Sequence, residues 1–135
     1  MIEFTIHEVP VPLSRPRFSR RGHVYTPDKC QKAKQRIGIA ALSKMQGTPP
    51  LDGPVELSIL FGMKMPKRPK PHQANGMFHT SRPDITNLVK LVEDSLNKIL
   101  WNDDSQICTI ITEKRYAVEP FTLVRVRQIN RDDQG

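Results

Sequence analysis

The chain has 135 residues, a net charge of +7 and a hydrophobic content of 37%, so it suits a single domain over residues 1–135 with a lean core. No apolar run approaches the roughly 18 residues typical of a membrane span, and no signal-peptide pattern opens the chain, so the sequence predicts a cytoplasmic protein without a membrane partner. Cys30 and Cys108 lie far apart without ligand spacing, which argues against a zinc site or a disulfide framework and predicts free thiols.

The first third of the chain is predicted to hold a strand, a basic loop and a helix. Residues 2–9 alternate well enough for a strand, and the prolines and arginines that follow predict an irregular loop over about residues 10–23. A short strand is predicted at 22–25, a cap and first turn at Thr26–Pro27, and a helix from Asp28 to about Met45. The residues predicted to face inward from this helix are Ala33, Ile37, Ala40, Ala41 and Leu42.

A strand and a long loop are predicted for the middle of the chain. Residues 54–65 read as a strand with one apolar face, formed by Val55, Leu57, Ile59 and Phe61. Residues 66–81 contain three prolines and no periodicity, and such a loop is usually functional or disordered, so we expect a mobile basic flap. His72 and His79 lie in this loop, although a lone loop histidine more often binds neither metal nor phosphate.

The clearest helix begins after Pro83, with Asp84 as a suitable N-cap, and is predicted to end into the turn from Trp101 to Gln106. Its apolar residues recur at steps of three and four: Ile85, Leu88, Val89, Val92, Leu96, Ile99 and Leu100. Its opposite stripe is polar and holds Thr86, Asn87, Lys90, Glu93, Asp94 and Asn97. A polar stripe is normally only solvated. Together with the Asp103–Asp104 pair beyond the helix end, however, it favours a set of oxygen ligands for a hard divalent cation such as magnesium.

The last third is predicted to form two strands, at 105–116 and 121–129, joined as an antiparallel pair by a turn through Glu119–Pro120. A polar tail at 130–135 is expected to fray. The expected fold is therefore α/β (α+β), with a small mixed or antiparallel sheet of about four to five strands and two main helices.

Basic residues gather in the two predicted loops, while acids concentrate between Asp84 and Asp104. Guanidinium groups bind phosphate through paired hydrogen bonds, and loops are where contact residues tend to lie. Contacts to a nucleic-acid backbone are predicted for Arg15, Arg17, Arg20, Arg21, Lys67, Arg68, Lys70 and Arg82. An acidic pocket inside a basic surface is the pattern expected of a metal-dependent nuclease.

Two segments of the chain resemble the RusA family of Holliday junction resolvases, which is common in bacteria and their prophages. They read RPRFSRRGHVYTPDK from Arg15 to Lys29 and RPDITNLVKLVEDSLNKILWNDDSQI from Arg82 to Ile107. The second segment carries Asp-x-x-Asn-x-x-Lys at the helix start, then Asp-Ser-Leu-Asn and Asp-Asp-Ser-Gln. The resemblance implies a RusA-like fold and a homodimer that uses Mg²⁺, with Mn²⁺ as an alternative, to cut two strands of a four-way DNA junction symmetrically.

The resemblance also implies which residues act. Catalytic roles fall on Asp84, Lys90 and Asp104, with Asn87 in the helix motif and Asp103 beside the last acid. Well-known members of the family carry a second aspartate where Thr86 stands, and a hydroxyl is a poor magnesium ligand.

Glu93 follows Thr86 by two helical turns on the same stripe, so we hypothesise that Glu93 compensates as a catalytic and metal-binding acid. Asp94 is a second candidate, and a salt bridge is the alternative role for Glu93. The predicted metal ligands are Asp84, Asp104, Asp103 and Glu93.

The predicted function is that of a magnesium-dependent, structure-specific endodeoxyribonuclease. It would resolve Holliday junctions by paired nicking in DNA recombination and repair, in association with the nucleoid. Two alternatives stay open: a nuclease for other branched DNA, and a catalytically impaired junction-binding protein in which Thr86 is the damaged ligand.

Overall fold

A computed structural model describes residues 1–15, 17–25, 28–130, 132 and 134. The predicted cap at Thr26–Pro27 and three residues of the predicted tail lie outside these ranges. The elements, in chain order, are β1 (Ile2–Ile6), β2 (Arg17–Phe18), β3 (Val24–Tyr25), α1 (Asp28–Met45), β4 (Val55–Lys64), the 3₁₀ turn η1 (Pro71–Gln73), α2 (Ile85–Leu96), the 3₁₀ turn η2 (Asp104–Gln106), β5 (Ile107–Ala117) and β6 (Phe121–Gln128).

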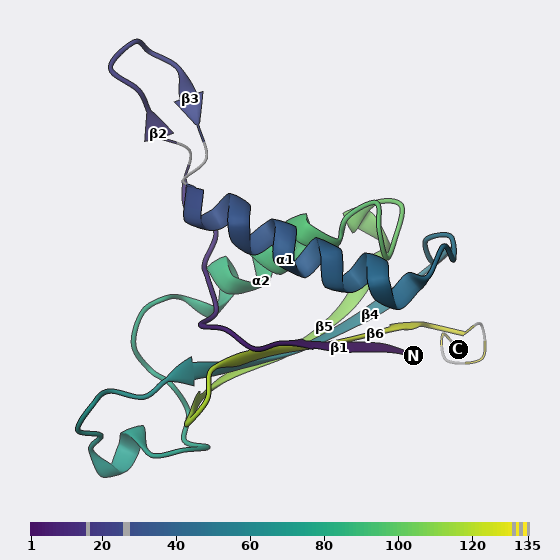
Figure 1. The fold of residues 1–135 in the computed structure, drawn as a ribbon. Helices are drawn as coiled ribbons and strands as arrows, with labels where there is room; N and C mark the ends of the chain where they lie inside the picture. Colours follow the sequence, from purple (N-terminus) through teal and green to yellow (C-terminus); the bar gives the residue numbers. More distant parts are fainter. Residues whose placement is uncertain (16, 26–27, 131, 133, 135) are drawn as a thin grey trace.

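The main sheet has four strands in the order β1-β6-β4-β5, and a separate two-stranded hairpin joins β2 to β3 (Figure 1). Strand β4 pairs with β5 in parallel and with β6 antiparallel, while β1 pairs antiparallel with β6. The predicted mixed sheet of four to five strands with two main helices is therefore confirmed.

The predicted pairing of the last two strands is wrong, because β4 lies between them. The short connection at residues 118–120 suggests that β5 and β6 form a hairpin. Instead, the segment that contains α2 links β4 to β5, and these two strands pair in parallel. Strand β6 then pairs with the other edge of β4. The Phe121 ring lies over Gly62 of β4, where any Cβ would clash with it. Glycine at this position makes room for the side chain that begins β6.

Both helices cover one face of the sheet (Figure 1). The predicted inward face of β4 is buried, and Val55, Leu57, Ile59 and Phe61 belong to one core with α2 and α1. For α1 the prediction fails at Leu42, which is 58% exposed beside the equally outward Ile39. Ala33, Ile37 and Ala41 face inward as predicted, and Cys30, Gly38 and Met45 are buried with them. The small side chains among these residues allow the two helices to approach closely. Both cysteines are free, as predicted.

Helix α2 ends at Leu96, earlier than predicted, because Lys98 adopts a left-handed conformation with φ of 72°. Ile99 and Leu100 still pack into or against the core from the turn that follows. No helix in the described part of the chain is long and apolar enough to cross a membrane.

The second half of the 66–81 loop is bound along the outer edge of β5 rather than free. Backbone hydrogen bonds join Gly76 and Met77 to Tyr116, and His79 to Lys114, at 2.8 to 3.0 Å. The Arg115 guanidinium stacks 3.9 Å from the centre of the Phe78 ring. The expectation of a mobile flap therefore does not hold for residues 76–79, whereas the basic half of the loop at residues 67–70 lies exposed.

Candidate active site

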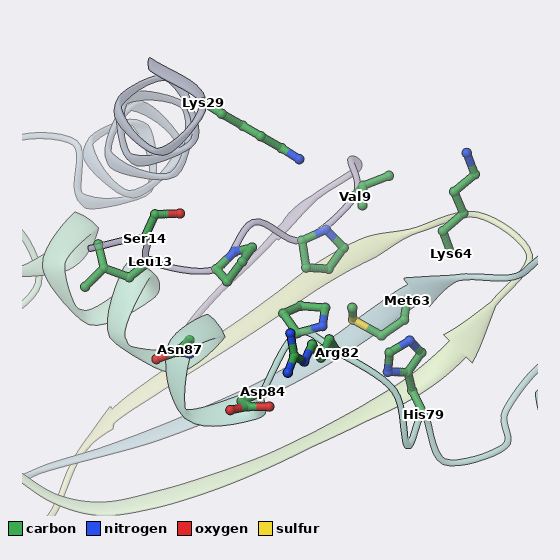
Figure 2. A pocket seen from close by; sticks show the side chains of 13 residues that line it. Val9, Leu13, Ser14, Lys29, Met63, Lys64, His79, Arg82, Asp84 and Asn87 are labelled. Carbon is green, nitrogen blue, oxygen red and sulfur yellow. The ribbon is translucent and has the colours of Figure 1, made fainter. Parts of the chain in front are cut away.

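A cleft of about 780 Å³ opens at the start of α2 (Figure 2). Its walls come from the N-terminal arm at residues 9–14, the first turn of α1, the end of β4 and residues 79–87. The polar residues that line it include Asp84, Asn87, Arg82, His79, Lys29 and Lys64. The cleft therefore brings together side chains from four separate parts of the chain.

Asp84 is the N-cap of α2 by backbone geometry, as predicted, and its carbonyl oxygen accepts hydrogen bonds from the amides of Asn87 and Leu88 at 3.1 and 3.2 Å. Within the described residues its carboxylate makes no capping hydrogen bond to the helix. A side chain that does not cap the helix keeps its oxygen atoms available for a ligand in the cleft. The exposed Asp84 carboxylate can therefore contact a ligand that binds in the cleft (Figure 2).

Asn87 lies in the first turn of α2, where its backbone carbonyl accepts a hydrogen bond of 2.9 Å from the Leu13 amide. This bond ties the N-terminal arm to the helix start and forms one wall of the cleft. Thr86, the position where the resemblance implies an acid, is exposed on the same turn.

The rim of the cleft is cationic. Arg82 lies beside the helix start, and Lys29 of α1 and Lys64 of β4 lie farther out, all three exposed (Figure 2). The cleft therefore holds one carboxylate and several cationic side chains, and this net positive charge favours binding of an anion such as a phosphate. A cluster of acids would favour a cation instead. Arg82 was predicted to contact phosphate, while Lys29 and Lys64 were not singled out.

Lys114 of β5 reaches the chain just before Asp84. Its Nζ donates hydrogen bonds to the carbonyl oxygens of Ser81 and Pro83 at 2.5 and 2.7 Å. Burial lowers the pKa of Lys114, and the negative charge of Asp84 acts in the opposite direction. The two charges are therefore close enough to interact.

His79 contributes a buried ring to the cleft wall, with an exposed fraction of 8%. Its ring centre lies 4.7 Å from that of Tyr116, and its Nδ1 has no hydrogen-bond partner among the described residues. Burial lowers the pKa of His79, and the nearby Lys114 charge lowers it further. At neutral pH this imidazole is therefore uncharged.

A second group of predicted site residues lies toward the other end of α2. Burial raises the pKa of Glu93 above its usual value, the negative charges of Asp104 and Asp94 raise it further, and Lys90 acts in the opposite direction. Glu93 and Asp104 are therefore neighbours that repel each other when both are ionised, with Lys90 close by. Such a pair is stabilised by a cation.

The turn after α2 fixes the Asp104 carboxylate. Trp101 is fully buried, and its indole N–H donates a hydrogen bond of 2.7 Å to Asp104 Oδ1. Gln106 holds the same turn, since its side chain accepts from the amides of Asn102 and Asp103 and donates to the Leu51 carbonyl. Asp104 is thus held by a core residue of the fold.

Asp103 and Asp94 have other partners. Asp103 caps the η2 turn by accepting from the Ser105 amide at 2.9 Å, and hydrogen bonds from Ser105 lower its pKa. Asp94 forms an ion pair of 3.6 Å with Lys34 of α1. Both acids therefore have structural contacts, whereas Glu93 and Asp104 form no ion pair among the described residues.

The structure does not gather the predicted ligands at one point. Asp84 and Glu93 are nine residues apart on one helix, which is about 13 Å along the axis at about 1.5 Å per residue. No group of three or more Asp, Glu, His or Cys side chains that could hold a metal ion occurs among the described residues. Asp84 at the helix start and the Glu93–Asp104 pair are thus two separate acidic positions.

The predicted DNA-contacting residues that can be placed are exposed. They are Arg15, Arg20, Arg21, Lys67, Arg68, Lys70 and Arg82. Arg17 lies in β2, but its side chain is outside what the structure describes. The basic hairpin and the basic loop project from the same end of the molecule, on either side of the α2 start, while the N-terminus and the end of β6 lie at the other end (Figure 1). Asp84 lies between the two basic segments.

Sequence reasoning missed Lys29, Lys64, Lys114 and the link from Trp101 to Asp104. Lys29 belongs to a helix face with many lysines, which is usually only solvated. Trp101 could have been noticed, because a tryptophan beside an acidic turn needs a partner for its indole N–H. Lys114 stands in a polar stretch of β5 and carries no local signal.

The chain is similar to known proteins over most of its length. Residues 8–127 match the family model described as "Endodeoxyribonuclease RusA". The chain is also 32% identical over 139 aligned positions to "Uncharacterized protein YqaN" of Bacillus subtilis (strain 168), an alignment that covers 96% of this chain and 97% of that protein. With its mixed sheet, its two helices and a match that spans both the cleft and the acidic turn, the chain belongs to the RusA family of endodeoxyribonucleases.

Proposed function

We propose that this protein is a divalent-metal-dependent endonuclease that binds four-way DNA junctions and cuts them by paired, symmetric nicks as a homodimer. The observation that carries the proposal is the placement of Asp84 in a cation-rimmed cleft, in a chain that belongs to the RusA family. The basic segments on either side of the α2 start support contact with DNA phosphates (Figure 1). Paired nicks suit a homodimer because a junction offers two equivalent strands to two equivalent sites.

The carboxylates of Glu93, Asp104 and Asp84 are suitable ligands for a magnesium ion, although their number is small. Magnesium is commonly held by one or two carboxylates, with water and substrate phosphate completing its shell. Glu93 and Asp104 offer two neighbouring carboxylates. Burial raises the pKa of Glu93, the negative charge of Asp104 raises it further, and a cation would relieve the repulsion between the two acids. Asp84 offers a further carboxylate where a phosphate would enter. A bound magnesium ion would polarise the phosphate and lower the pKa of an attacking water.

The other residues of the chain would bind, orient and balance charge. We assign contacts with backbone phosphates, whose affinity falls as salt rises, to Arg15, Arg17, Arg20, Arg21, Lys67, Arg68, Lys70 and Arg82. Lys90, which lies close to Glu93, would stabilise negative charge on the phosphate or the leaving oxygen. Asn87 and the bound N-terminal arm would shape the cleft. Asp103 would support the acidic turn as its cap.

Cleavage of a labelled four-way junction, with and without magnesium, tests the proposal, with linear duplex and a fork as comparison substrates. We expect paired nicks at opposite strands that need magnesium and vanish in Asp84→Asn. Faster cleavage of the fork than of the four-way junction would contradict the assignment of the junction as substrate, although the protein would still be a nuclease.

A second candidate, an impaired junction-binding protein, is favoured by Thr86 at the position of the family's second acid. It predicts tight junction binding with no cutting in magnesium or manganese. Under that outcome, Thr86→Asp is the variant expected to restore cleavage, because it supplies the missing carboxylate.

A further inference from the structure

Lys114 is a lysine on the core-facing side of a strand. In the parallel pairing of β4 with β5 it is the partner of Phe61, whose buried side chain faces the helices. Paired residues on neighbouring strands point to the same face of a sheet, so the half-buried Lys114 points to the face that the helices cover. Partial burial of an ammonium group is unfavourable unless the group finds hydrogen-bond partners.

The partners of Lys114 are two backbone carbonyls that flank the entry to α2. Its Nζ donates to Ser81 O at 2.5 Å and to Pro83 O at 2.7 Å. An ammonium group has three N–H donors, so one remains after these two bonds. Hydrogen bonds from a charged donor are stronger than neutral ones, so this contact fixes the chain on both sides of Arg82.

Asp84 follows Pro83 directly, so the position of its carboxylate depends on this segment. The same residue starts the backbone ladder of α2, because its carbonyl accepts from the amides of Asn87 and Leu88. The 76–79 segment is held to β5 by other bonds, including the Arg115 contacts with Gly76 and Phe78. Lys114 therefore acts on residues 81–83, while Arg115, its neighbour on the strand, acts on residues 76–78.

We propose that Lys114 is a positioning residue: by bridging the Ser81 and Pro83 carbonyls it sets the place and direction of the Asp84 carboxylate in the cleft. The inference rests on the proposed function for its effect on cleavage, and on geometry alone for its effect on the helix start. Displacement of a reacting group by about 1 Å can cost about 10²-fold in rate, so loss of this bridge should affect turnover strongly.

The test compares Lys114→Met, which keeps the length of the side chain and removes the donors, with Arg115→Met as the matched control on the same strand. We expect Lys114→Met to lower kcat for junction cleavage by about 10²-fold at saturating magnesium, while the junction Kd stays within about threefold. Arg115→Met should leave both values near those of the wild type. Lys114→Arg should recover part of the rate, because a guanidinium group also donates to two carbonyls.

Amide hydrogen exchange supplies a readout that does not need cleavage. In Lys114→Met the Asn87 and Leu88 amides should lose protection by about tenfold or more, while the Val92 amide in the middle of α2 keeps its protection. If the methionine variant is too unstable, Lys114→Gln, which retains two N–H donors without charge, is measured in the same way and should show smaller changes in the same direction.

The outcomes separate the two proposals. A wild-type protein that cuts no branched DNA overturns the proposed function, and exchange at the helix start still decides the role of Lys114. Unchanged kcat and unchanged protection at Asn87 and Leu88 overturn the positioning role. A uniform loss of protection along α2, with kcat at the wild-type level per folded molecule, also overturns it, because that pattern belongs to a purely structural lysine.

Discussion

The two ends of α2 carry acids in opposite surroundings. At the start, a single exposed carboxylate, Asp84, faces a cleft whose rim holds Arg82, Lys29 and Lys64. Toward the end, Glu93 lies close to Asp104; burial raises the pKa of Glu93, and the negative charge of Asp104 raises it further. The first arrangement favours an anion and the second a cation. A row of acids along one helix therefore need not form one site.

The two ends are also held in place by different means. Asp84 depends on backbone contacts, through the Lys114 bridge and the first turn of α2. Asp104 depends on the core, because the buried Trp101 donates to it directly. Substitutions at the two ends should therefore have separable effects on cleavage, cation binding and stability.

The largest effect is expected from Asp84→Asn. Removing a charged group that acts in the transition state should lower junction cleavage by about 10²- to 10³-fold, because the neutral amide cannot share a cation with the phosphate once DNA is bound. Junction affinity should stay the same or rise, since one negative charge leaves a cationic cleft. Single-turnover cleavage and a binding titration on the same samples measure both. Weaker binding together with normal cleavage would assign Asp84 to a different role.

Trp101→Phe should have the next largest effect. The phenyl ring keeps much of the buried surface but cannot donate to Asp104, and loss of such a supporting hydrogen bond typically costs about 10- to 100-fold in metal affinity or activity. The measurement is the magnesium concentration that gives half-maximal cleavage.

Leu100→Val is the matched control, since Leu100 is also fully buried and is not a hydrogen-bond partner of Asp104. It should lower stability without changing the magnesium requirement. Equal magnesium requirements in the two variants would show that the Trp101–Asp104 bond serves only the fold.

Glu93→Gln should make the metal-free protein slightly more stable at neutral pH. The folded-state pKa of Glu93 is raised, so the native state binds more protons than the unfolded state above about pH 4.5, and its contribution to stability is lost as pH rises through this window. The gain should stay below about 1 kcal/mol, because solvent screens a half-buried carboxylate. Chemical unfolding with chelator at about pH 7 and about pH 4 measures it.

The exposed Glu119→Gln is the control for this substitution and should show no gain. Magnesium should reverse the order of stability, because it would bind the wild type and not the Glu93→Gln variant. A Glu93→Gln variant that is less stable without magnesium would mean that Glu93 has a favourable partner instead of a repelling neighbour.

His79 gives the smallest expected effect, at the edge of the cleft. Its folded-state pKa is lowered, so the native state binds fewer protons than the unfolded state below about pH 6.5; stability is complete above that pH and is lost as pH falls. One such group changes stability by at most about 1.4 kcal/mol per pH unit. His79→Phe should flatten the stability profile between about pH 5 and about pH 6.5, whereas the exposed His72→Phe should not. Identical slopes in the two variants would contradict this assignment.

The parts of the fold set by local pattern could be predicted from the sequence. Alternation in β4 and the apolar stripe of α2 each follow from one period, so both elements and most of their buried residues were correct, although α2 ends earlier than predicted. The predicted pairing of β5 with β6 was wrong: the connection between them is short, but strand order depends on competition between distant segments of the chain. In α1, Ala33, Ile37 and Ala41 were correctly predicted to face inward, whereas Leu42 was placed inward from its hydrophobicity and the buried Gly38 was not predicted.

The candidate site was predictable in part, and mainly through the resemblance. It named Asp84, Lys90 and Asp104, which remain proposals. The hypothesis that Glu93 replaces an acid at Thr86 rests on the angle around the helix, and it requires the Glu93 side chain to span a rise of about 10 Å between the two residues. Lys114 could not be found in advance, because its importance comes from backbone carbonyls more than 30 positions earlier in the chain.

Magnesium binding to the DNA-free protein, measured by calorimetry for the wild type, Asp84→Asn and Glu93→Gln, tests most directly whether the two ends of α2 bind different ions. We expect Glu93→Gln to lose most of the magnesium affinity and Asp84→Asn to bind as the wild type does, because without DNA the cation is held by Glu93 and Asp104. Equal losses in both variants would contradict this expectation, since they would mean that Asp84 and Glu93 share one metal site.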